Sequence, residues 1–130
     1  MKIHLVDRDT QYKVNADPGL LRQVFINIFD NGVKYAHSNT DITVKSHIQK
    51  KSNDLLIEVI NSSDPIPRDL WERIFEVGFR GENAQRLIAS GTGLGLYICR
   101  SILGVYDGSI HYVGRSNESI FTIRLPGAWI

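Results

Sequence analysis

The 130-residue sequence predicts a single α+β domain in which helices cover one face of a largely antiparallel sheet. Segments that alternate between apolar and polar residues predict the strands, and two segments with apolar residues at helical spacing predict the main helices. These elements follow the order strands, helix, strands, loop, helix and hairpin. No repeat, low-complexity tract or linker divides the sequence, so we expect residues 1–130 to form one domain.

The composition is that of an ordinary globular protein, with 42% hydrophobic and 22% charged residues. Fifteen basic and fourteen acidic residues give a net charge of +1, so the chain has no overall field that would gather nucleic acid or anionic lipid. The one cysteine, Cys99, cannot form an internal disulfide and favours a reducing compartment. No signal peptide or long apolar stretch occurs. We therefore expect a cytoplasmic domain without nucleic-acid or membrane contact, which leaves open an anchor elsewhere in a longer parent protein.

The first predicted helix begins at Asp17-Pro18. Asp can accept hydrogen bonds from the free N–H groups of a first turn, and Pro is tolerated at the first helical position. Gly32 lies late in the segment and weakens its last turn. The apolar stripe of this helix comprises Leu20, Leu21, Val24, Phe25, Ile28 and Phe29.

Alternating patterns predict extended segments in residues 2–15, 42–48, 55–60, 109–114 and 119–125. The segment at 55–60 is the most apolar and is expected to be the more buried strand. Ser116-Asn117 separates the last two segments, which therefore predict a β-hairpin.

Two further helices and a loop complete the prediction. A short helix is expected over residues 68–75, started by Pro67, and the polar, glycine-containing residues 78–93 predict a mobile loop. A longer helix is expected over residues 95–105. Its expected apolar face consists of Leu94, Ile98, Ile102 and Val105.

Four polar residues share one face of the first predicted helix: Asn27, Asn31, Lys34 and Tyr35. Neutral amides cannot perform acid–base chemistry, but their carbonyl oxygens can bind a hard cation such as Mg²⁺. Lys34, one turn beyond Asn31, can reach a phosphate. The spacing alone favours the alternative, a solvated polar face with a chance pair of Asn residues.

Gly91-Thr92-Gly93-Leu94-Gly95-Leu96 leads into the 95–105 helix. Glycines let a ligand approach the backbone closely, and N–H groups at a helix N-terminus bind anions. A polar loop precedes the motif, whereas a dinucleotide fingerprint needs a strand there, and the Gly-Lys-Ser/Thr of a phosphate-binding loop is absent. A phosphate site and a tight loop-to-helix turn both remain open.

Residues Asn61 to Pro67 follow the buried strand, at a position where a polar side chain often projects into a pocket. Taken alone, the segment is better interpreted as a turn rich in Ser and Pro. Its place in the chain changes that interpretation. An Asn-Asn helix, a strand that ends in a polar residue before Ile-Pro, a Phe-x-x-x-Phe pair and a glycine-rich helix start are not expected together by chance.

From Val14 to Pro126 the sequence resembles the catalytic ATP-binding domain of sensor histidine kinases, within the Bergerat-fold ATPase superfamily. LRQVFINIFDNGVKYA resembles the N box of that family, INSSDPIP the G1 box, IFEVGFRG the F box and GTGLGL the G2 box. SIFTIRLP resembles the closing strand. The resemblance implies a two-layer α/β sandwich, with a mixed five-stranded sheet, three helices on one face and a flexible ATP lid over residues 78–90.

The resemblance also implies ATP and Mg²⁺ as cofactors and a role for individual residues. Asn31 would hold Mg²⁺, and Asn27 would support the phosphate and metal site. Lys34 and Tyr35 would contact the phosphates or the sugar, and Arg80 would be a mobile phosphate contact. The other residues implied at the nucleotide site are Asn61, Ser63, Ile66, Phe79, Gly91, Thr92, Gly93, Leu94, Gly95, Leu96 and Ser119.

The G1-like segment departs from the D-x-G-x-G pattern of the family. Asn61 stands where the family has an Asp that accepts a hydrogen bond from the adenine amino group, and Ser63 and Pro65 stand where it has glycines. Asn61 can still accept through its carbonyl oxygen, but losing the charge of the carboxylate could cost on the order of 1 kcal/mol of binding. Weakened or altered nucleotide binding is therefore one expectation.

Kinases of this family transfer the γ-phosphoryl group of ATP to a histidine on a separate helical domain. None of His4, His37, His47 and His111 lies in an amphipathic helix. We therefore expect the acceptor and sensor domains to be absent, no catalytic residue in this fragment, and no autophosphorylation by it. The implied partners are ATP or ADP, the acceptor-histidine dimerisation domain of the parent kinase and a response regulator.

Two other functions stay open at this point. The changes at Asn61, Ser63 and Pro65 fit a degenerate module that binds nucleotide weakly or not at all and docks a response regulator or a partner kinase. A serine kinase of the anti-sigma type is disfavoured, because such enzymes and the superfamily ATPases usually place a general-base Glu where Asn27 stands.

Overall fold

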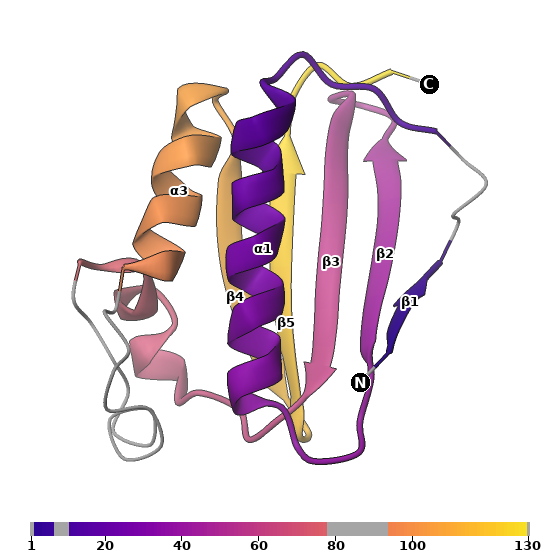
Figure 1. The fold of residues 1–130 in the computed structure, drawn as a ribbon. Coiled ribbons are helices and arrows are strands. Elements are labelled where there is room, and N and C mark those ends of the chain that lie inside the picture. The colour runs from indigo at the N-terminus through magenta and orange to yellow at the C-terminus, as the bar shows by residue number, and fades with distance from the viewer. Residues whose placement is uncertain (1, 7–10, 78–93, 130) are drawn as a thin grey trace.

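A mixed five-stranded sheet forms one layer of the computed structural model, which describes residues 2–6, 11–77 and 94–129 (Figure 1). The strand order is β1-β2-β3-β5-β4, in which β1 runs parallel to β2 and the other neighbours are antiparallel. The predicted sheet is therefore confirmed. Its strands are β1 (Ile3–Leu5), β2 (Ile42–Gln49), β3 (Asp54–Ser62), β4 (Ser109–Arg115) and β5 (Glu118–Leu125).

Helix α1 (Pro18–Tyr35) begins at the predicted position. The Oδ2 atom of Asp17 accepts the N–H of Leu20 at 2.9 Å, which caps the first turn. The helix continues through Gly32, where a Cβ atom would lie 2.9 Å from Cδ1 of the buried Ile42. The glycine therefore lets the last turns of α1 lie close to the start of β2.

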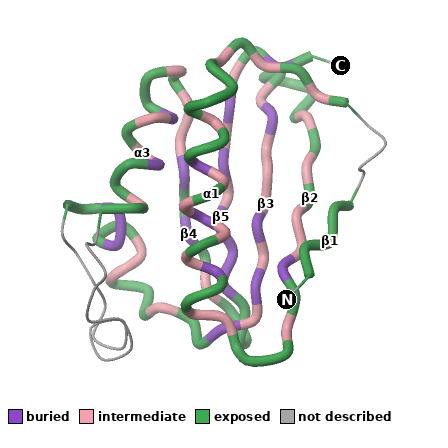
Figure 2. Tube along the Cα trace, viewed as in Figure 1, coloured by how far each residue is buried: buried purple, intermediate pink, exposed green. Residues whose placement is uncertain are grey.

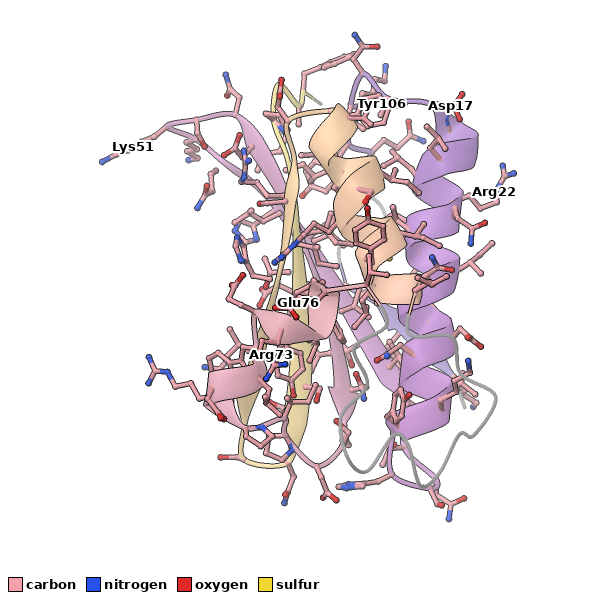
Figure 3. The ribbon with its side chains drawn as sticks, turned by 90° about the vertical axis from the view of Figure 1, so that its left-hand side faces the viewer. Asp17, Arg22, Lys51, Arg73, Glu76 and Tyr106 are labelled. Carbon is pink, nitrogen blue, oxygen red and sulfur yellow. The ribbon has the colours of Figure 1, made fainter. Side chains whose placement is uncertain are left out.

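Helix α3 (Gly95–Val105) lies beside α1 on the same face of the sheet (Figure 1). The main-chain N–H of Asp17 donates to the hydroxyl of Tyr106 at 3.0 Å and ties the start of α1 to the end of α3 (Figure 3). None of the helices in the described ranges is long and apolar enough to cross a membrane.

The predicted apolar face of α3 is confirmed at Ile102, which packs against the core, but is wrong at its other three positions. Ile98 is 37% exposed and Val105 is 71% exposed, whereas Cys99 and Leu103 are fully buried. The reason is that α3 packs against α1, β4 and the 3₁₀ turn at residues 73–75. The residues of α3 that face these three neighbours are the buried ones. Cys99 is a core residue, small enough for its Sγ atom to lie 3.5 Å from the carbonyl oxygen of Val24.

The short helix predicted over residues 68–75 consists of two 3₁₀ turns, η1 (Arg68–Leu70) and η2 (Arg73–Phe75). Trp71, between them, donates its indole N–H back to the carbonyl of Ile66 at 2.8 Å. Ile74 and Phe75 are buried against the sheet. These anchors draw the segment into tight turns instead of a continuous α-helix.

The core lies between the helical layer and the strands β3, β5 and β4, where the buried residues gather (Figure 2). The β4–β5 hairpin turns at Ser116 and Asn117, both with positive φ, as in the two-residue turns that suit twisted hairpins. This confirms the predicted hairpin. The loop predicted over residues 78–93 lies outside the described residues.

Candidate functional site

Asn27 joins the middle of α1 to the first residue of α3. Its Nδ2 atom donates to the carbonyl oxygen of Gly95 at 3.2 Å, and its Oδ1 atom accepts from Nε2 of Gln23 at 2.8 Å. Both polar atoms of the side chain are therefore engaged. The effect is to hold the polar face of α1 against the N-terminus of α3.

The rest of this polar face lies further toward the C-terminus of α1. Asn31 is half-buried and its side chain makes no hydrogen bond with another described residue. Lys34 pairs with Asp30 one turn earlier, with Nζ 3.0 Å from Oδ2, and both side chains are largely exposed. An exposed ion pair of this kind is weak. The Lys34 ammonium can therefore leave Asp30 and bind a more highly charged anion instead. Tyr35, the last residue of the helix, is half-buried.

Three polar side chains are buried among the described residues, and all three lie together: Asn61, Ser63 and Ser119. We call them the buried polar cluster. Asn61 of β3 and Ser119 of β5 are direct neighbours in the sheet register. The hydroxyl of Ser63 donates to Oγ of Ser119 at 2.6 Å. Each of the three is at most 5% exposed.

A tyrosine extends this cluster toward the 3₁₀ turns. The Tyr112 hydroxyl lies 2.7 Å from Oγ of Ser119 and accepts the main-chain N–H of Ile66 at 2.9 Å. The carbonyl of Ile66 accepts the indole N–H of Trp71, so both backbone groups of this half-buried residue are fixed. Sequence reasoning missed Tyr112 and Trp71. The alternation of the 109–114 strand could have identified Tyr112, because a Tyr whose side chain faces the core needs a hydrogen-bond partner for its hydroxyl.

The cluster lies on the helix-covered face of the sheet. Asn61 is the register partner of Ile42, which the last turns of α1 approach at Gly32. The segment after Asn61 crosses over β4, because a Cβ atom at Gly114 would lie 2.8 Å from Cβ of Pro65. Thus Pro65 occupies the space that a glycine in β4 leaves free.

The N-terminus of α3 supplies the last described part of the site. Leu94 and Gly95 are exposed and Leu96 is half-buried. No described atom lies within 4 Å of a Cβ position at Gly95, so the backbone is open there. The first N–H groups of a helix have no partner within the helix and can bind an anion. Phe79, Arg80, Gly91, Thr92 and Gly93, also predicted at the site, lie outside the described residues.

These features agree with the match of residues 16–128 to the model of the histidine kinase-, DNA gyrase B-, and HSP90-like ATPase family. The chain belongs to this family. Among curated relatives it is 32% identical over 121 residues to the sensor-like histidine kinase SenX3 of Mycolicibacterium smegmatis, covering 92% of this chain and 31% of the relative. It is 39% identical over 97 residues to the sensory kinase SasA of Crocosphaera subtropica, covering 75% and 25%. The chain thus spans about a third or less of these relatives.

Solved structures place this ATPase-family chain among histidine kinase catalytic domains. The nucleotide-free catalytic domain of the histidine kinase ThkA is 31% identical, with a TM-score of 0.76, covering 96% of this chain and 78% of that one. ThkA in complex with the response regulator TrrA is 28% identical, with a TM-score of 0.73, covering 96% and 33%. The predicted Bergerat fold and the predicted family are confirmed, and the chain is a histidine kinase ATPase domain of the two-component type.

Proposed function

We propose that this chain binds Mg-ATP between the polar face of α1, the buried polar cluster and the N-terminus of α3. It would then present the γ-phosphate to a histidine on a separate dimerisation domain of a parent sensor kinase. The observation that carries the proposal is the hydrogen bond from Asn27 to the carbonyl of Gly95, because it holds an amide-bearing helix against an open helix N-terminus. Residues 1–130 would act as one catalytic ATP-binding unit.

Backbone N–H groups at the start of α3, from Leu94 to Leu96, are proposed to bind phosphate oxygens together with Gly91, Thr92 and Gly93. A helix N-terminus favours anions because of the helix dipole and because its first N–H groups have no partner within the helix. Lys34 would add a cation, and Tyr35 and Arg80 would add further contacts to the phosphates or the sugar. Positioning and neutralisation of charge are the main contributions a protein makes to phosphoryl transfer.

Asn31 is the residue that we assign to Mg²⁺. Its half-buried amide has no hydrogen bond with another described residue, so Oδ1 is available to a cation that prefers oxygen ligands. Asn27, in contrast, already uses both polar atoms of its side chain. When bound, Mg²⁺ would neutralise part of the phosphate charge.

The buried polar cluster is proposed to face the nucleotide base. Asn61 lies near the end of β3, on the face of the sheet that the helices cover. Ser119 is its neighbour in β5, and Ser63 is hydrogen-bonded to Ser119. Ile66, which Tyr112 and Trp71 fix through its backbone, would offer an apolar contact to the base, and Phe79 would add another.

We further propose that the chain neither hydrolyses ATP efficiently nor phosphorylates itself. An amide at Asn27 cannot serve as a general base. The four histidines lie outside the described helices, and three of them lie near carboxylates: His4 near Asp41, His37 near Asp64 and His111 near Glu72, at 2.8, 3.0 and 4.0 Å. Incubation with labelled ATP should leave no acid-labile phosphate on the chain. Stable phosphohistidine on the chain would contradict this.

Calorimetric titration with ATP and ADP, in Mg²⁺ and in EDTA, tests the binding proposal. We expect saturable binding that Mg²⁺ strengthens, and Asn31→Ala should lower the Mg²⁺-dependent gain by about tenfold, or about 1.4 kcal/mol. Asn31→Asp retains an oxygen ligand and should keep the gain. An unchanged Mg²⁺ dependence in Asn31→Ala would remove Asn31 from the metal site.

A docking module without nucleotide is the second candidate. It is favoured by the G1-like segment, whose Ser63 hydroxyl is bonded into the core and whose Pro65 fills space over Gly114. ThkA, a structural neighbour, is seen in complex with the response regulator TrrA, and we propose a response regulator as a partner here as well. Absence of any heat with millimolar nucleotide, together with binding of a response regulator, would favour this candidate.

A further inference from the structure

The buried polar cluster contains no charged group. Asn61, Ser63 and Ser119 are the buried polar or charged residues among those described, and each can either donate or accept a hydrogen bond. The two carboxylates next to the cluster in the sequence, Asp64 and Glu118, are both exposed, and Asp64 pairs with His37 at 3.0 Å. The buried polar cluster itself therefore contains no side chain that can only accept a hydrogen bond.

Asn61 is the member of the cluster with free hydrogen-bonding capacity. Its residue is 4% exposed, yet its side chain has no hydrogen bond with another described residue. No fully enclosed side-chain N or O atom in the described ranges lacks a partner, so the Asn61 amide reaches an accessible space. Rotation of the amide by about 180° exchanges its acceptor Oδ1 and its donor Nδ2 at the same place.

The hydroxyls beside Asn61 are equally adaptable. The N–H of Ile66 donates to the Tyr112 hydroxyl and the Ser63 hydroxyl donates to Ser119, but in the bond between Tyr112 and Ser119 either hydroxyl can be the donor. Ser119, the register partner of Asn61, therefore offers either its hydrogen or a lone pair. The hydroxyls of the cluster thus do not fix a single hydrogen-bonding pattern beside Asn61.

We propose that this site accepts 6-oxopurine nucleotides, such as inosine and guanosine triphosphates, nearly as well as ATP. The inference rests on the proposed function, since it assumes that a purine lies against Asn61. Adenine offers an amino donor at C6 and an acceptor at N1, whereas hypoxanthine and guanine offer the reverse pattern. An amide matches both patterns, but a carboxylate at this position would repel O6 and match adenine alone.

Calorimetry with ATP, ITP and GTP in Mg²⁺ tests the inference. ITP is the decisive ligand, because it changes the base edge at C6 and N1 without the added 2-amino group of guanine. We expect the dissociation constants of ATP and ITP to agree within about threefold. In Asn61→Asp, the preference for ATP over ITP should rise by at least about tenfold, the usual penalty for an unmatched buried hydrogen bond.

Asn61→Ala is the matched control, because it removes the amide without adding charge and should weaken ATP and ITP equally. Thermal unfolding of each variant establishes that it is folded, and the wild-type comparison of ATP with ITP needs no variant. Binding of ATP with rejection of ITP by tenfold or more would overturn the inference and leave the proposed function intact. Absence of binding by every nucleotide would overturn both.

Discussion

The polar face of α1 and the buried polar cluster use polar side chains in different ways. Asn31 and Lys34 lie on the surface of a helix and make at most one weak ion pair with described residues. Ser63 and Ser119 lie in the core and belong to a chain of hydroxyls that ends on a backbone N–H. Substitutions at Asn31 and Lys34 should therefore change ligand affinity with little cost in stability, whereas substitutions in the chain of hydroxyls should change stability.

Removal of the Tyr112 hydroxyl should have the largest effect on stability. Tyr112→Phe leaves the N–H of the half-buried Ile66 without a partner and removes one of the two hydrogen bonds of the buried Ser119 hydroxyl, which keeps its bond to Ser63. We expect a loss of about 2 kcal/mol in the free energy of unfolding, measured by urea denaturation. Tyr97→Phe is the control, because Tyr97 is exposed on α3. Equal stabilities of the two variants would contradict a structural role for the hydroxyl chain.

The contrast between the two regions also explains what could be predicted from the sequence. The start of α1 and the β4–β5 turn were predicted because Asp17-Pro18 and Ser116-Asn117 act through neighbouring residues. Asn27 and Asn31 could be selected because helical spacing puts them on one face. The bond between Ser63 and Ser119 joins residues 56 positions apart, and no local pattern contains it. The same holds for the buried face of α3, which its neighbours decide.

The thiol of Cys99 tests how deeply water reaches between α1 and α3, beneath the polar face. Burial raises the pKa of Cys99 to about 11 from the usual 9.0. The unfolded state therefore loses the proton first, and the stabilisation is fully present below pH 9 and is lost as the pH rises toward 11. Between pH 8 and 10, unfolding of the wild type should become easier by about 1.4 kcal/mol relative to Cys99→Ala.

Urea denaturation of wild type and Cys99→Ala at both pH values measures this difference. The variant corrects for the lysines and tyrosines that titrate in the same range, and any small cavity it creates does not depend on pH. Parallel pH profiles of the two proteins would show that the thiol is hydrated. The α1–α3 contact would then be open below Asn27, and the division between an exposed face and a closed core would not hold there.

Lys34→Ala should give the smallest effect, and it should act on affinity alone. The ammonium of Lys34 is exposed and its pair with Asp30 contributes only a few tenths of a kcal/mol to stability. We expect ATP to bind about threefold more weakly, or about 0.7 kcal/mol, with a shallower dependence of affinity on salt. Arg22→Ala is the matched control, because it removes the same charge from the other end of α1, where Arg22 projects outward (Figure 3). If both variants weaken ATP binding equally, Lys34 contributes to ATP affinity only through net charge.

If Lys34→Ala lowers stability as much as Tyr112→Phe does, the polar face of α1 is part of the folded scaffold. Affinity could then not be changed there independently of stability.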